Sequence, residues 1–202
     1  MPLLLASTFQ HFKKIDVFQE QLSTWKVACI TTAALAQIDD VVDRPDWVIG
    51  EIEAIETRAG EFFEYDLRGK NSDDLDRDLQ SCDLIYFIGG NTFVLLEYLQ
   101  KSNFQKFIVP FLAAGKSLWG GSAGAIINCP DIHYIACMDE PEKANLNSTK
   151  GLSLTSLSII PHWKCGHHQE ALECLSKNPD LDLICLTDDQ AIYINDNCIE
   201  VL

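Results

Sequence analysis

The sequence predicts an α/β fold in which helices cover both faces of a mostly parallel sheet. Short apolar runs alternate along the chain with segments of helical periodicity. Each run is continuously apolar, as in strands that are buried on both faces, and does not alternate apolar with polar residues. This order of elements is typical of a sheet sandwiched between helices.

Apolar runs define the expected strands, which are Leu3–Ser7, Val27–Thr32, Phe62–Leu67, Leu84–Ile88, Ser117–Trp119, a strand from Leu157 ending at His162, Leu183–Leu186, Ala191–Ile194 and Cys198–Val201. Apolar spacing predicts helices at Phe9–Leu22, between Pro45 and Gly60, from Ser72, after Thr92, from Ala125 and at Gly166–Lys177. An Asn195–Asn197 turn is expected to join the last two strands. The sequence contains no repeat or linker, so we expect residues 1–202 to form one domain.

The chain is strongly acidic, with a formal net charge of −15. This charge argues against nucleic acid as a partner, because DNA and RNA binding requires a basic face. The acidic residues concentrate at Asp39–Asp46, Glu51–Glu64 and Asp73–Asp83, which we interpret as solvated helix faces.

The eight cysteines occur singly, without a C-x-x-C motif. Several lie inside apolar runs, as the buried reduced thiols of cytosolic proteins do. Met1–Ala6 lacks the basic start of a signal peptide, and no apolar run reaches the ~20 residues of a membrane helix. We therefore expect a cytoplasmic monomer or homodimer that does not bind membranes.

The most informative stretch is Gly120-Gly121-Ser122-Ala123-Gly124, a G-x-S-x-G sequence between an apolar strand and a helix start. A serine at such a corner sits on a strained turn that exposes its hydroxyl, and the flanking glycines avoid collisions with neighbouring backbone. The helix start also offers free N–H groups to a developing oxyanion. The alternative is a tightly packed turn without chemistry, because the pattern is short.

Gly89 and Gly90 follow the fourth strand, where an α/β sheet forms its ligand crevice. They can present bare N–H groups to the oxyanion of Ser122, with Asn91 and Thr92 beside them as candidate substrate contacts. A tight turn is again the structural alternative. No phosphate loop or dinucleotide fingerprint can be written here, so no nucleotide is expected.

A serine nucleophile needs a base and usually an acid that orients the base. His162 follows a proline at the end of an apolar strand, the edge where Ser122 should also lie. The order Ser122, Asp139, His162 matches α/β serine hydrolases. Cys165, His167 and His168 are a weaker candidate for a metal site, because they lack partner ligands, and we expect no metal.

Three motifs together resemble the dipeptidase E and cyanophycinase family of serine peptidases: I-G-G-N-T-F-x-L-L at 88–96, G-x-S-A-G-A at 120–125 and I-x-P-H-W at 159–163. The resemblance extends over roughly Leu3–Ile194. It implies a flavodoxin-like α/β/α sandwich like that of class I glutamine amidotransferases. It further implies that Ser122 attacks the amide, that His162 is the base, and that Ala123 and one of the two glycines supply the oxyanion hole.

The chain departs from this family at two places. Cys137 stands where the family aspartate falls, which leaves Asp139 or Glu140 as the third triad member, and the resemblance favours Asp139. No arginine occurs after Arg77, although the family's aspartyl dipeptidases hold the substrate carboxylate with one. Lys164 is the expected substitute, and preference for N-terminal aspartate should be weak or absent.

The function expected from the sequence is therefore a serine exopeptidase that hydrolyses short peptides without a cofactor. The alternative is a catalytically silent flavodoxin-like protein that binds a small ligand in the same crevice.

Overall fold

The computed structural model describes residues 2–35, 44–195 and 198–202. Two sequence interpretations therefore fall partly outside the described residues: the acidic face that starts at Asp39 and the turn at 195–197. Among the described helices, none is both long and apolar enough to cross a bilayer.

The centre of the molecule is a seven-stranded sheet with the order β3-β2-β4-β5-β1-β8-β9. Neighbouring strands from β3 to β1 are parallel, whereas β8 and β9 are antiparallel, so the predicted mostly parallel α/β sheet is confirmed. The strands are β1 (Leu3–Ala6), β2 (Lys26–Ile30), β3 (Glu61–Tyr65), β4 (Leu84–Phe87), β5 (Ser117–Gly121), β8 (Ala191–Asn195) and β9 (Cys198–Val201).

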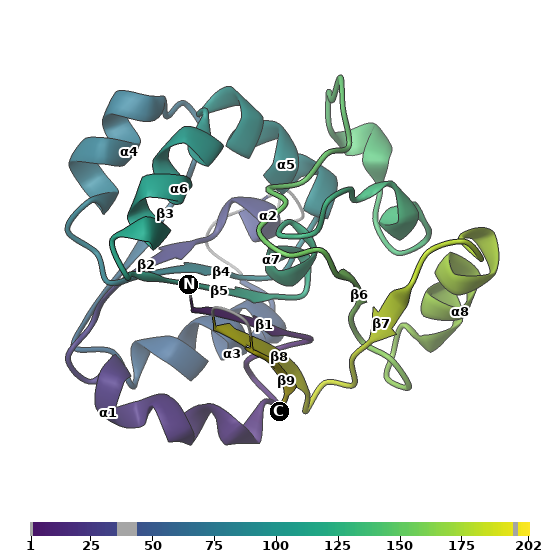
Figure 1. Ribbon diagram of the computed structural model, residues 1–202, viewed down its shortest axis with the longest axis horizontal. Coiled ribbons are helices and arrows are strands. Elements are labelled where there is room, and N and C mark those ends of the chain that lie inside the picture. The colour runs from purple at the N-terminus through teal and green to yellow at the C-terminus, as the bar shows by residue number, and fades with distance from the viewer. Residues whose placement is uncertain (1, 36–43, 196–197) are drawn as a thin grey trace.

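Helices cover both faces of this sheet (Figure 1). One face carries α4 (Ser72–Leu79), α5 (Thr92–Lys101), α6 (Phe104–Ala113) and the single turn α7 (Ala123–Ile126). The other face carries η1 (Lys13–Phe18), α1 (Gln19–Leu22) and α3 (Asp46–Glu56). The short helix α2 (Thr32–Leu35) follows β2.

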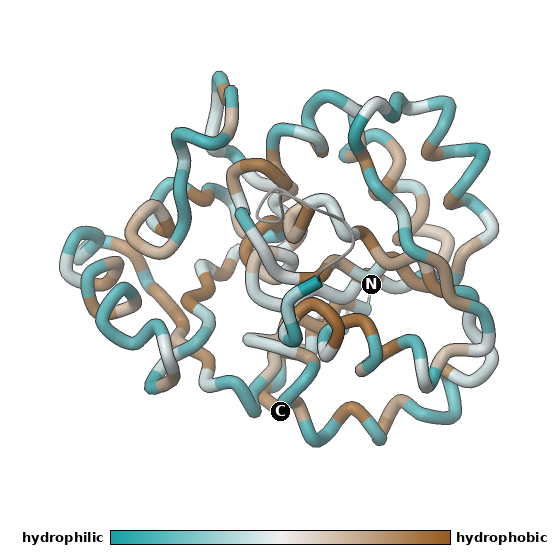
Figure 2. Tube along the Cα trace, turned by 180° about the vertical axis from the view of Figure 1, so that it is seen from behind, coloured by the Kyte–Doolittle hydropathy of each residue, from teal (hydrophilic) through white to brown (hydrophobic). Residues whose placement is uncertain are grey.

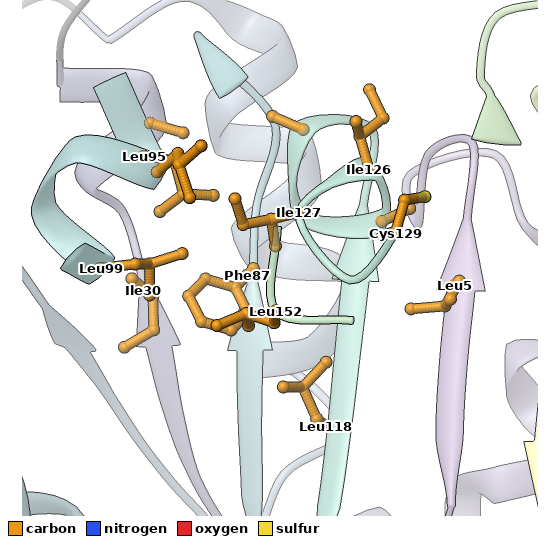
Figure 3. Close-up of a cluster of buried hydrophobic side chains, with 14 of the residues drawn as sticks. Leu5, Ile30, Phe87, Leu95, Leu99, Leu118, Ile126, Ile127, Cys129 and Leu152 are labelled. Carbon is orange, nitrogen blue, oxygen red and sulfur yellow. The ribbon is translucent and has the colours of Figure 1, made fainter. Parts of the chain in front are cut away.

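Alternate residues of the buried strands supply the two halves of the core. Phe87 and Leu118 point to the face of α5, where Leu95 and Ile127 pack on them (Figure 3). Trp119 packs on the opposite face, with its ring stacked on Phe9. Hydrophobic residues accordingly gather along the central strands, and the outer helix turns are largely hydrophilic (Figure 2).

A small second sheet lies beside the main one and consists of β6 (Ser158–Ile160) and β7 (Leu183–Cys185). Between these strands the chain forms α8 (His168–Lys177), which packs against η2 (His133–Cys137); η3 (Pro141–Lys143) follows η2. This lobe brings the segments after β6 and after β7 to the carboxyl edge of the main sheet.

The two largest differences from the sequence predictions concern helices. The single helix expected at Phe9–Leu22 is instead a 3₁₀ segment followed by one α-helical turn, because Phe9 and Phe12 turn into the core before the helix begins. Helix α6 was not predicted, since its apolar residues occupy most of its circumference and Pro110 lies inside it.

Strand register brings two glycine-rich turns together. Phe87 of β4 pairs with Gly120 of β5, so Gly89 and Ser122 both lie two residues beyond the same paired position. A Cβ atom placed on Gly89 would lie 3.3 Å from Cβ of Ser122, which confirms that the two turns touch.

Candidate active site

A cavity of about 450 Å³ opens at the carboxyl edge of the sheet. Its walls come from stretches that lie far apart in the sequence, between Thr8 and Asp188, and the parallel topology brings them to one edge. Among its lining residues are Gly89, Ser122, Asp139, His162 and Asp188.

Ser122 occupies a strained corner between β5 and α7, with φ 50° and ψ −113°. Such a backbone conformation costs a non-glycine residue about 1–3 kcal/mol and persists only where the surroundings impose it. The Ser122 N–H donates to the Ala6 carbonyl of β1, and the N–H groups of Ala125 and Ile126 donate to the Ser122 carbonyl. These bonds hold the corner and leave the hydroxyl on the cavity side, as the G-x-S-x-G pattern predicts.

His162 lies directly opposite this hydroxyl. Its Nε2 is 2.9 Å from Oγ of Ser122, and its Nδ1 is 2.7 Å from Oδ1 of Asp188. When Asp188 accepts a hydrogen bond from the Nδ1–H group, Nε2 is the basic nitrogen and can take the serine proton. The expectation that Ser122 and His162 meet at this edge agrees with the structure.

Ser7, which directly follows β1, forms hydrogen bonds with both Asp188 and His162. Its hydroxyl donates to Asp188 Oδ1 over 2.7 Å and accepts the backbone N–H of His162, also at 2.7 Å. Burial alone would raise the pKa of Asp188, but hydrogen bonds from His162, Ser7 and Cys165 lower it below its ordinary value. Asp188 therefore stays ionised beside the imidazole.

Asp139 does not occupy the position predicted for it. Its carboxylate lines the cavity, but it accepts the Thr92 N–H at the start of α5 over 2.9 Å, and the acid hydrogen-bonded to His162 is Asp188. Burial raises the pKa of Asp139, although the hydrogen bonds from Thr92 act the other way. The alternative Glu140 pairs with Lys143 at 2.5 Å and is not in contact with His162.

Asn91 and Thr92 also differ from their predicted role as substrate contacts. Both are fully buried and neither lines the cavity. Asn91 caps α5 by accepting the Val94 N–H at 2.9 Å, and its amide donates to the Glu140 carbonyl. Together with Thr92 it holds the segment that carries Asp139.

Lys164 is exposed and lines a neighbouring cavity of about 850 Å³, not the cavity that contains Ser122. The turn after His162 explains this placement, since His162 and Lys164 both have positive φ values, 58° and 61°. The chain reverses there, and the lysine leaves the wall that His162 lines.

Three N–H groups beside Ser122 are available for an oxyanion. Among the described residues, the amides of Gly89, Gly90 and Ala123 have no hydrogen-bond acceptor. Gly90 has φ 133°, and a Cβ there would lie 2.2 Å from the carbonyl carbon of Ala33, so only glycine fits. Gly90 thus allows the β4–α5 turn to approach α2, and Gly89 is the glycine that faces Ser122.

The cluster considered for a metal does not converge. His167 lines the cavity, with its ring centroid 5.6 Å from that of His162, whereas His168 packs against Trp163. Within the described ranges no three His, Cys, Asp or Glu side chains are grouped as metal ligands. The expectation of metal-independent activity stays a prediction.

Sequence reasoning did not identify Asp188, Ser7 or Glu51, another residue that lines the cavity. Ser7 and Asp188 could have been found from their positions. Ser7 directly follows an apolar strand and Asp188 closely follows another, both at the carboxyl edge. Glu51 carried no such signal, because it lies within an acidic helical stretch.

A serine, a histidine and a carboxylate in hydrogen-bond contact at the edge of a parallel sheet are the arrangement of serine hydrolases. The model of peptidase family S51 matches residues 3–202 of this chain. The chain therefore belongs to peptidase family S51 and is a serine-type peptidase.

Relatives and solved structures agree with this assignment. "Uncharacterized peptidase Lin0382" of Listeria innocua is 34% identical over 163 residues, which are 80% of this chain and 76% of the relative. Lmo0363 of Listeria monocytogenes, also named an uncharacterized peptidase, is 34% identical over 80% of this chain and 77% of its own.

The crystal structure of a "Putative Peptidase E Protein" from Listeria monocytogenes EGD-e superposes with a TM-score of 0.87 at 29% identity. It covers 100% of this chain and 97% of its own. A peptidase from an acI-B1 actinobacterium shares the fold, with a TM-score of 0.68 at 19% identity over 100% of this chain and 86% of its own.

Proposed function

We propose that the chain is a serine exopeptidase for short peptides in which Ser122, His162 and Asp188 act as nucleophile, general base and orienting acid. The observation that carries this proposal is the unbroken chain of contacts from Ser122 Oγ to His162 Nε2 at 2.9 Å and from His162 Nδ1 to Asp188 at 2.7 Å.

In the proposed reaction the Ser122 hydroxyl attacks the peptide carbonyl while His162 Nε2 takes its proton. The carbonyl oxygen gains the negative charge, which the N–H groups of Ala123 and of Gly89 or Gly90 stabilise. His162 then protonates the leaving amine, and the acyl-enzyme forms. Water, deprotonated by the same histidine, releases the acid and restores Ser122.

The size of the cavity supports a short substrate. A volume of about 450 Å³ is within the range of sites that enclose a small ligand. The strained backbone of Ser122 also favours a catalytic role over the catalytically silent binding role considered from the sequence. Ligand binding alone does not require a serine in a strained conformation.

Labelling with a fluorophosphonate tests this proposal. We expect covalent modification of Ser122, located by mass spectrometry of the digested protein, and loss of labelling in His162→Ala. Modification of a different serine, or none at all in the folded protein, would contradict the assignment.

A further inference from the structure

Helix α3 reaches the Ser122 cavity from the opposite face of the sheet to α5. Two of its residues, Trp47 and Glu51, line the cavity. They are four residues apart, so they lie on one face of the helix. Trp47 also lies close to the oxyanion turn, since a Cβ on Gly89 would be 3.6 Å from its ring.

Glu51 is an unusual residue for this position because it is only 4% exposed. Its Oε1 accepts the Thr8 hydroxyl and the Gln10 N–H, the latter at 3.1 Å, and its Oε2 accepts the Tyr86 hydroxyl at 2.9 Å. All three groups donate to the side-chain oxygens of Glu51. A carboxylate accepts about four hydrogen bonds, so these contacts leave acceptor capacity for a ligand.

In the described part of the chain no lysine, arginine or histidine forms an ion pair with Glu51. Residues 36–43, which precede α3, include no basic residue in the sequence. Because buried carboxylates are normally paired with a cation, a cavity-lining one without a partner points to a cationic ligand.

The position of Glu51 also fits a cation that is part of the substrate. Its Oε2 lies 2.7 Å from where a Cβ of Gly121 would be, immediately before the nucleophile. In an amino acid the α-nitrogen is only about 2.5 Å from the carbonyl carbon, given the standard bond lengths and angle. A carbonyl attacked by Ser122 therefore brings the ammonium of the first residue into the region of Glu51.

We propose that Glu51 binds the α-ammonium group of the substrate's first residue and that the Trp47 ring packs beside it as a cation–π partner. This proposal rests on the proposed function and names the residue that makes the enzyme an exopeptidase. An N-acylated peptide presents a neutral amide, which leaves the buried carboxylate uncompensated, and such substrates are rejected.

A matched substrate pair tests this role: alanine p-nitroanilide and propionic acid p-nitroanilide, which differ only in the amino group. In the wild type we expect kcat/KM to favour the alanine compound by about a hundredfold or more, the usual scale for a lost buried charge partner. In Glu51→Gln the preference should fall to within about threefold, through slower hydrolysis of the alanine compound alone. Glu53→Gln, an exposed position on the same helix, is the matched control and should keep the preference.

The pH profile gives an independent readout. An α-amino group loses its proton near pH 8, so kcat/KM of the wild type should fall above that pH for the alanine compound and not for the propionic acid compound. Equal losses on both substrates in Glu51→Gln, or no change on either, would overturn the proposal. Equal wild-type rates on the two compounds would do so without any variant.

Failure of the proposed function is distinguishable from failure of this inference. Fluorophosphonate labelling of Ser122 does not depend on a substrate ammonium, so Glu51→Gln should still be labelled at Ser122. If Ser122 of the wild type is not labelled, the serine mechanism itself is contradicted. If labelling is intact but Glu51→Gln keeps the wild-type substrate preference, only the role of Glu51 is contradicted.

Discussion

Asp188 and Asp139 are carboxylates of the same cavity that are held in opposite electrostatic environments. Asp188 accepts hydrogen bonds from His162 and Ser7, whereas Asp139 is buried against the start of α5. Replacement of Asp188 by asparagine should lower kcat about 10⁴-fold, because the amide stabilises the wrong imidazole tautomer. Asp139→Asn keeps an acceptor for Thr92 and should cost less than about tenfold, as steady-state kinetics can show. A larger loss in Asp139→Asn would reverse our assignment.

The same two residues predict stability changes of opposite sign with pH. The pKa of Asp188 is lowered in the folded state, so its contribution to stability is present above about pH 4 and is lost as the pH falls further. The pKa of Asp139 is raised, so its ionisation destabilises the fold as the pH rises from about 4 through the folded pKa.

Urea unfolding of the two asparagine variants between pH 3 and 7 measures these opposite trends. Asp139→Asn should gain stability relative to the wild type as the pH rises, and Asp188→Asn should lose it. Parallel curves for both variants would contradict the electrostatic account.

The identity of the third triad member shows the limit of residue-scale prediction. A general chain order of serine, acid and histidine favoured Asp139, but in the structure the acid beside His162 follows it in the sequence. Asp188 lies in the turn between β7 and β8, and its distance from His162 depends on how the β6–β7 lobe folds back. No local pattern encodes that return, whereas the strained serine corner is encoded locally and was predictable.

At the scale of elements, the junction of β5 and α7 depends on bare glycine backbone. A Cβ on Gly120 would lie 2.0 Å from the Gly124 carbonyl oxygen, so strand and helix turn cannot both keep their positions. We expect Gly120→Ala to lower the free energy of unfolding by about 3 kcal/mol or more.

Gly69→Ala is the matched control for this change. Gly69 has φ 73°, and no heavy atom lies within 4 Å of a Cβ placed there. The Gly69→Ala substitution therefore costs only backbone strain, about 1–2 kcal/mol. Urea titration of both variants separates collision from backbone strain. Equal losses would show that the contact with Gly124 carries no special cost.

The strands were easier to predict than the helices for a physical reason. Central strands buried on both faces appear in the sequence as continuous apolar runs with clear ends. The strands β1, β2, β4 and β5 were all located from such runs. Segment Phe9–Leu22 has helical spacing, but its phenylalanines are drawn into the core and the chain forms only short helical turns. Tertiary packing determines the secondary structure of such segments, and apolar periodicity alone does not.

At the scale of the whole molecule, we expect charge to govern which peptides the enzyme accepts. The described wall of the Ser122 cavity includes the carboxyl groups of Glu51, Asp139 and Asp188 but no lysine or arginine. With a net charge of −15, the protein also repels acidic substrates at long range.

We therefore expect kcat/KM for Asp-Leu to be no greater than for Ala-Leu or Asn-Leu. Lys164→Ala should leave these ratios unchanged, because Lys164 lines the neighbouring cavity. A preference for Asp-Leu above about a thousandfold, roughly 4 kcal/mol, would mean that a cation we have not assigned binds the substrate carboxylate.

Ser122 and His162 are expected to act as one catalytic unit, and a comparison of single and double variants checks this expectation. The measurement is kcat for a cleaved dipeptide in the wild type, Ser122→Ala, His162→Ala and the double variant. Because neither residue works alone, each single change should cost nearly as much as both together, up to about a millionfold. Losses that multiply in the double variant, or near-normal hydrolysis by Ser122→Ala, would contradict the account.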